Sequence, residues 1–76
     1  MYLKVVTKNG SEQTYDCERF GFHKGVKTEE GKQNMLEIST GVHGEINLFL
    51  QPGDAFYVMN ADGKTIDSRL MDDQGA

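Results

Sequence analysis

The fold is decided by residues 45–70, EINLFLQPGDAFYVMNADGKTIDSRL, which have the pattern of three consecutive strands joined by two turns. Successive side chains of a strand point to opposite faces, and apolar residues recur at alternate positions along this stretch. The first turn is predicted at 51–54, where Pro52 fixes φ and Gly53 tolerates positive φ. The second turn is predicted at 61–63, Ala-Asp-Gly. The stretch is therefore expected to form the scaffold of the domain.

Residues 1–18 predict a β-hairpin. Aromatic and β-branched side chains are frequent in 2–8, and Asn9-Gly10 follows, a pair that favours a tight turn because both residues tolerate positive φ. Residues 11–18 are then expected to return antiparallel, with Tyr15 and Cys17 on one face.

The next segment, 19–27, requires a change in the alternation. Phe20 and Phe22 share a face if the segment is extended, but their parity is opposite to that of the preceding apolar face. One extra residue reverses the alternation of a strand, so a bulge or bend is predicted near 18–21.

The middle of the chain predicts a loop and then a strand. Residues 28–33, TEEGKQ, are polar with a central glycine, which is typical of an exposed loop. A short helix through 29–35 is the alternative, and Gly31 would interrupt it. Residues 34–40 predict a short strand, and 41–44 a turn.

The whole pattern predicts an all-β protein of about six short strands joined by tight hairpin turns that contain glycine. A small antiparallel barrel or a strongly curved sheet is favoured, because a flat sheet of this size would not enclose a core. We expect one domain over 1–71 and an acidic, frayed tail over 72–76. The predicted core consists of Leu3, Val5, Leu36, Ile38, Ile46, Leu48, Leu50, Phe56, Val58, Ile66 and Leu70.

Size and charge limit the classes of function. A chain of 76 residues without tryptophan has a small core, which a homodimer would enlarge by burying more apolar surface. The net charge of −4 argues against duplex nucleic acid or an anionic membrane as the main partner. One cysteine, the lack of a secretory signal after Met1 and the lack of a long apolar run favour the cytoplasm.

The residues suited to catalysis are few. Nucleophilic catalysis needs a thiol or hydroxyl beside a base, and Cys17 with His23 or His43 is the only pairing that the sequence offers. The two histidines with Asp54 could bind a metal ion, but they lack the close spacing of typical ligands. We therefore expect no catalytic residue, metal or cofactor, and a protein that is not an enzyme.

Residues 19–27, RFGFHKGVK, suggest single-stranded nucleic acid as an alternative partner. Aromatic rings stack on unpaired bases while basic side chains contact phosphates. The FGF core resembles the RNA-binding strand of cold-shock proteins, which are small acidic β-barrels that bind single strands. That resemblance implies a stacking platform, although the family's second aromatic strand is replaced here by TEEGKQNMLEIST. The residues of this alternative site are Arg19, Phe20, Phe22, His23, Lys24 and Lys27.

Residues 45–70 also predict a second candidate surface. If the alternate apolar residues point inward, then Phe49, Tyr57 and Met59 point outward on neighbouring strands, joined by Tyr2. Such a cluster is either covered within the monomer, by a loop or the N-terminal hairpin, or forms a protein interface. The leading prediction is a non-catalytic β-module that acts by protein–protein binding and self-associates as a homodimer. A regulator or inhibitor is one form of this role, including an acidic protein that mimics nucleic acid.

Overall fold

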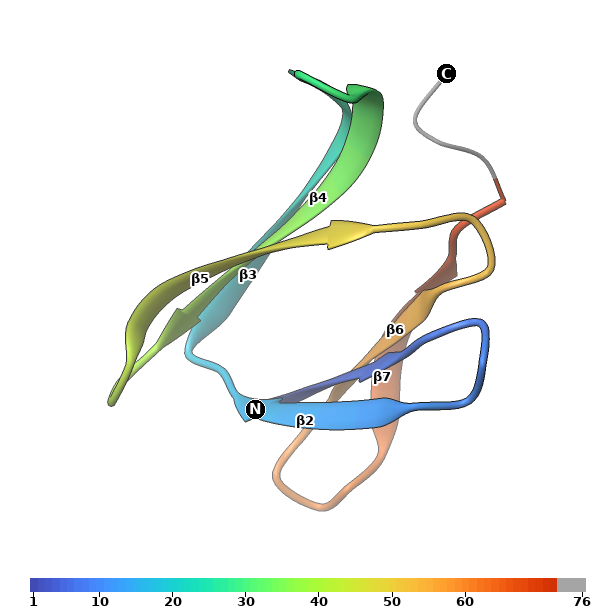
Figure 1. Ribbon diagram of the computed structural model, residues 1–76. Helices are drawn as coiled ribbons and strands as arrows, with labels where there is room; N and C mark the ends of the chain where they lie inside the picture. The colour runs from blue at the N-terminus through green and yellow to red at the C-terminus, as the bar shows by residue number, and fades with distance from the viewer. Residues whose placement is uncertain (73–76) are drawn as a thin grey trace.

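The computed structural model describes residues 1–72 as seven antiparallel β-strands (Figure 1). The all-β prediction is confirmed. Of the tail predicted at 72–76, only Asp72 lies within the described residues. The strands are β1 (Tyr2–Val6), β2 (Glu12–Asp16), β3 (Arg19–Thr28), β4 (Gly31–Thr40), β5 (Gly44–Leu50), β6 (Ala55–Met59) and β7 (Thr65–Leu70).

The strands form two sheets, which corrects the predicted barrel or strongly curved sheet. One sheet has four strands in the order β2-β1-β6-β7, and the other has three in the order β3-β4-β5. Figure 1 shows the three-stranded sheet beside the sheet that contains β2, β6 and β7. The barrel prediction fails because the chain passes from one sheet to the other, so that a core is enclosed without closing a single sheet.

The first crossing lies between β2 and β3. The amide of Cys17 donates a hydrogen bond to the carbonyl of Met1 in the four-stranded sheet, at 2.9 Å. The next amide, that of Glu18, donates to the carbonyl of Ser39 in the three-stranded sheet, at 2.8 Å. The change in alternation predicted at 18–21 therefore comes from a crossing between sheets. The register shift of β3 lies further on, between His23 and Val26.

The second crossing is the turn at 51–54. Pairing places β5 and β6 in different sheets, so the hairpin predicted here is wrong although the turn itself is present. The amide of Asp54 donates to the carbonyl of Gln51 at 3.0 Å, and Gly53 has a φ of 93°. The buried carboxylate of Asp54 accepts hydrogen bonds from the amides of Gln51 (2.8 Å) and Lys8 (3.0 Å). It thereby joins the end of β5 to the turn between β1 and β2.

The loop predicted at 28–33 is a tight hairpin instead. Thr28 pairs with Gly31, so β3 and β4 continue to the turn and leave only Glu29 and Glu30 outside the strands. The Thr28 hydroxyl donates to the carbonyl of Gly31 at 2.7 Å and accepts from the amide of Glu30. The polar composition of 28–33 predicted a loop because these ends of β3 and β4 lie at the exposed end of the sheet.

The core lies between the two sheets and agrees with most of the prediction. Its predicted members Ile46 and Leu48 are partly buried, and Cys17 and Met71 are additional buried members. The ring of Phe56 contacts the rings of Phe20 and Phe22, with centroids 6.2 and 5.8 Å apart. The predicted residues that are buried are Leu3, Val5, Leu36, Ile38, Leu50, Phe56 and Val58.

Two predicted core residues on β7 are exposed. Ile66 is 58% exposed and Leu70 is 66% exposed. The register pairs Phe56 with Arg69, which turns Arg69 toward the core side and Leu70 away from it. An irregularity in the pairing opposite Val58 and Met59 leaves Ile66 without a partner residue. Alternation correctly placed Arg69 and Leu70 on opposite faces, but the face assigned to the interior was wrong, and the irregularity puts Thr65 opposite Met59, apart from Asp67 and Arg69.

Candidate protein interface

The outer face of the four-stranded sheet carries three of the four residues predicted to form an interface. In the register of β1 with β6, Tyr2 lies opposite Met59 and Lys4 lies opposite Tyr57. Their neighbours Leu3 and Val58 point into the core, so these four side chains point outward. Tyr2 is 43% exposed, and Tyr57 and Met59 are half-buried.

The edge strand β7 extends this surface with two further apolar side chains. Leu70 pairs with Ala55 on β6, and Ile66 lies at the irregularity beside Met59. Both were predicted to be in the core, and both are exposed. Alternation in the sequence does not reveal this exposure, which depends on how β7 pairs with β6. We call the resulting surface the apolar face; its residues are Tyr2, Tyr57, Met59, Ile66 and Leu70.

Polar side chains border the apolar face toward β2. The ammonium of Lys4 lies 3.3 Å from a carboxylate oxygen of Glu12 and 5.4 Å from the centre of the Tyr57 ring. A cation held over an aromatic ring is stabilised by the negative charge of the ring face. The apolar face therefore combines aromatic and aliphatic side chains with polar ones, since Tyr57 lies between Lys4 and Ser68, and protein interfaces likewise combine apolar and polar side chains.

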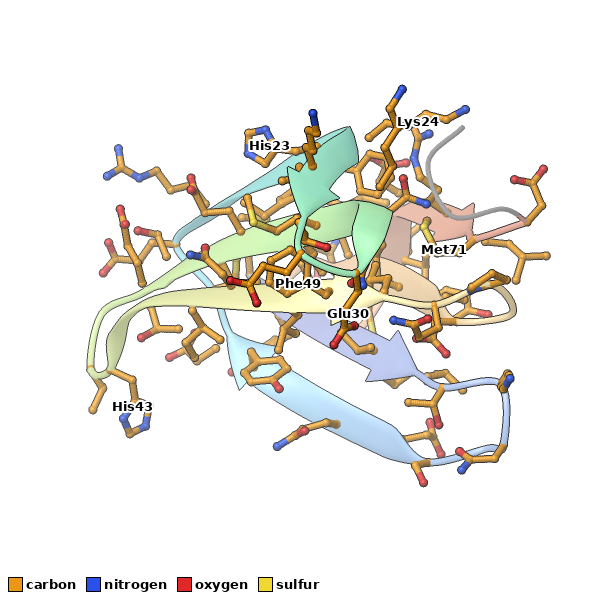
Figure 2. All side chains as sticks on the ribbon, turned by 45° about the horizontal axis from the view of Figure 1, so that its top comes forward. His23, Lys24, Glu30, His43, Phe49 and Met71 are labelled. Atoms are coloured by element: carbon orange, nitrogen blue, oxygen red, sulfur yellow. The ribbon has the colours of Figure 1, made fainter. Side chains whose placement is uncertain are left out.

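Phe49, the fourth predicted interface residue, lies on the other sheet. It is 46% exposed and pairs with Met35 on β4. The expectation that Phe49 and Tyr57 lie on neighbouring strands is wrong, because β5 and β6 belong to different sheets. Figure 2 shows Phe49 on β5, on the same sheet as His23. One continuous patch containing all four residues does not form within the monomer.

The residues of the nucleic-acid alternative are divided between two faces. Phe20 and Phe22 pack against the core, and the guanidinium of Arg69 lies 4.5 Å from the centre of the Phe22 ring. These contacts occupy the ring surfaces on which a base would stack. Arg19 and His23 alternate with the phenylalanines and lie on the outer face of β3. Lys24 and Lys27 are exposed near the register shift.

Within residues 1–72, no hydrogen bond joins the thiol of Cys17 to His23 or His43. Cys17 is buried, and its thiol donates a hydrogen bond to the carbonyl of Arg19 at 3.1 Å. Burial raises the pKa of this thiol above its ordinary value of 9.0, which favours the unreactive protonated form. His23 lies beside Met35, whereas His43 lies in the turn after β4. A strand rises ~3.4 Å per residue, so the part of β4 from Met35 to Thr40 keeps them ~17 Å apart along the strand. Figure 2 shows the two histidines well apart.

A metal site is not assembled either within residues 1–72. These residues contain no group of three or more histidine, cysteine or carboxylate side chains placed to bind an ion. The carboxylate of Asp54, weighed as a ligand, accepts hydrogen bonds from two backbone amides instead. The same part of the chain forms no helix long and apolar enough to cross a bilayer.

Comparison of the chain with protein-family models, curated proteins and solved structures finds no match. The arrangement of side chains is therefore the basis on which a function can be proposed.

Proposed function

We propose that this domain is a non-catalytic β-module that acts by protein–protein binding and self-associates through the apolar face. The observation that carries the proposal is the exposure of Ile66 and Leu70 on β7, in the sheet whose outer face also exposes Tyr2. The core between the sheets is complete without them. Large apolar side chains that gather on one face are typical of interaction sites.

A second copy of the chain suits this face. A two-fold axis places the same surface on both partners, so tyrosine and aliphatic side chains would pack against their equivalents. Two sheets can pack face to face at about 10 Å. Four strands are ~19 Å wide, and a strand of six residues is ~20 Å long. The two facing footprints together come to ~760 Å², below the ~1,200 Å² at which stable interfaces begin, so we expect a weak dimer that dissociates on dilution.

Sedimentation velocity over a wide range of protein concentrations tests the proposal. We expect a dimer at high concentration and a monomer on dilution. Tyr57→Ser and Leu70→Ser should each shift the equilibrium toward the monomer, because each removes apolar contact area from the apolar face. Phe49→Ser is the matched control, since Phe49 has similar exposure to Tyr2 but lies on the other sheet. A strict monomer at all concentrations, or a dimer that tolerates both serine variants, would contradict self-association.

The buried free thiol of Cys17 is consistent with a reducing compartment such as the cytoplasm, where a regulator or inhibitor would meet its target. Microscopy of the tagged protein in its native host tests the location.

Single-stranded nucleic acid remains the less supported partner, because Phe20 and Phe22 pack against the core. Salt-sensitive binding of an unstructured oligonucleotide that is lost in Lys24→Gln or Lys27→Gln would favour it instead. No binding at low salt would exclude it.

A further inference from the structure

A groove runs between the two edge strands β2 and β5. Each is the last strand of its sheet, and β5 and β2 lie along the same side of the molecule (Figures 1 and 2). Two hollows of about 320 and 200 Å³ lie between residues of these strands. Both are lined by Gln13 and Tyr15 of β2, so the two hollows adjoin along this strand, and we refer to them together as the groove.

The free edge of β2 presents backbone hydrogen-bonding groups to this groove. The amide of Thr7 donates to the carbonyl of Ser11, and the amide of Cys17 donates to the carbonyl of Met1. In an antiparallel pair, residues bond to the partner strand at alternate positions. These two bonds therefore assign the pairing with β1 to residues 11, 13, 15 and 17. The amides and carbonyls of Glu12, Thr14 and Asp16 point away from β1, toward the free edge.

The side chains of the groove combine an apolar floor with a negative border. Tyr15, Ile46 and Leu48 supply apolar surface from both sheets. Glu12 and Asp16 lie along the edge, and none of the described residues that line the two hollows is lysine or arginine. The ammonium of Lys4 pairs with Glu12, which leaves Asp16 as the carboxylate of this edge without an ion pair among residues 1–72. An occupant with positive charge would therefore be favoured.

We propose that this groove binds an extended, basic segment of a partner protein, which pairs as an additional strand with the free edge of β2. Addition of a strand to an open sheet edge gives affinity through backbone hydrogen bonds and specificity through alternate side chains. The apolar side chains of the segment would lie over Tyr15 and Leu48, and its lysine or arginine side chains would lie near Glu12 and Asp16. The segment would close the side of the molecule that β2 and β5 leave open.

A second copy of the chain fits this groove less well. If two β2 strands paired antiparallel about Thr14, Glu12 of one copy would lie opposite Asp16 of the other. Like charges at opposite positions destabilise a strand pair. The proposed site uses the free edge of β2, whereas the apolar face extends from Tyr2 on β1 across β6 to β7, so the two sites adjoin only where Tyr2 lies opposite Asp16. A monomer in sedimentation would overturn the proposed dimer without affecting peptide binding, and failure to bind a peptide would leave the dimer intact.

Binding of short synthetic peptides, measured by fluorescence anisotropy, tests the proposal. The probe is a labelled peptide of alternating valine and lysine, compared with one of alternating valine and glutamate. We expect binding of the lysine peptide alone, weakened by salt. Two further lysine peptides carry N-methyl groups either on every valine amide or on every lysine amide. Only one edge of an added strand bonds to β2, so one methylated peptide should bind and the other should not.

Variants of β2 provide the second arm of the test. Thr14→Pro removes an amide that points to the groove while leaving the bonds to β1, and should weaken binding roughly five- to ten-fold. Thr14→Val is the matched control, since it keeps the amide. Asp16→Asn should reduce both affinity and its dependence on salt. Denaturation curves verify that each variant folds.

Three results would overturn the proposal. Equal binding of the two N-methylated peptides would show attraction by charge alone, without strand pairing. Unchanged affinity in Thr14→Pro would place the peptide elsewhere. A dimer that is disrupted by Thr14→Pro, together with no peptide binding, would assign the edge to a second copy.

Discussion

The two sheets have similar inner faces and very different outer faces. Both inner faces supply aliphatic and phenylalanine side chains to one core. The outer face of the four-stranded sheet exposes Tyr2, Ile66 and Leu70, whereas charged residues such as Glu37 and Glu45 occupy the outer face of the other sheet, with Phe49 near one end. Folding requires only the inner faces, so the apolar outer residues of one sheet call for a separate explanation. The proposed role in protein binding offers that explanation.

The two sheets are joined by core side chains and by a few polar contacts, and substitutions at these points test how strongly each sheet depends on the other. We expect the largest effect from Phe56→Ala, because Phe56 is buried and contacts phenylalanine rings of the opposite sheet. Removal of a buried phenylalanine costs about 3–5 kcal/mol. The free energy of unfolding from urea titration measures this loss. Phe49→Ala is the control, and a similar loss there would mean that inner and outer faces do not differ as described.

The second-largest loss of stability is expected at Asp54, whose carboxylate joins the turn between β5 and β6 to the turn between β1 and β2. Asp54→Ala leaves the amides of Lys8 and Gln51 without their acceptor, and should reduce the free energy of unfolding by about 2 kcal/mol. Asp62→Ala, in an exposed turn, is the matched control and should change stability little. Equal melting temperatures for the two variants would show that this link between the sheets is dispensable.

The crossing turn itself can be compared with an ordinary hairpin turn. Gly53 and Gly63 both have positive φ, at 93° and 80°. A Cβ added at Gly53 would lie 2.7 Å from the Cβ of Lys8, whereas nothing lies within 4 Å at Gly63. Alanine at either site should cost about 1 kcal/mol for the backbone conformation, with a further loss at Gly53 from the contact. Thermal unfolding of both variants measures the difference, and an equal loss would indicate that Lys8 moves aside freely.

The smallest effect is expected at Arg69, whose guanidinium crosses from β7 to the Phe22 ring on β3. Arg69→Gln removes the cation but keeps a polar side chain, and should destabilise the protein by about 0.5–1 kcal/mol. The control is Arg19→Gln, on the outer face of β3. Denaturant titration of both variants, at low and high salt, measures their free energies of unfolding. Equal values would show that the contact between Arg69 and Phe22 does not help to hold the two sheets together.

Alternation in the sequence was sufficient to predict which residues share a face. Leu36 and Ile38 on β4, and Phe56 and Val58 on β6, are buried as predicted. Alternation does not reveal when a turn changes sheet, because Pro52-Gly53 has the same composition in a hairpin and in a crossing. The two-sheet arrangement therefore required the pairing of β1 with β6, which are far apart in sequence.

The interface residues were predicted only in part, again because alternation does not reveal which strands are neighbours in a sheet. Tyr2, Tyr57 and Met59 do lie together, since they belong to paired strands, and their role in binding stays a prediction. Leu70 was missed because its face depends on the register with β6, and alternation alone suited Leu70 and Ile66 better to the core than Arg69. Phe49 was grouped with Tyr57 through a hairpin that does not form.

The strand order also sets when each sheet can form during synthesis. The sheet β3-β4-β5 is a meander of neighbouring strands, and all its partners exist once Leu50 has been made. Strand β1 lies at the centre of the other sheet, yet its partner β6 begins only at Ala55. Pairing between distant segments slows folding because a long loop must close first. One edge of β1 therefore stays unpaired until β6 has left the ribosome.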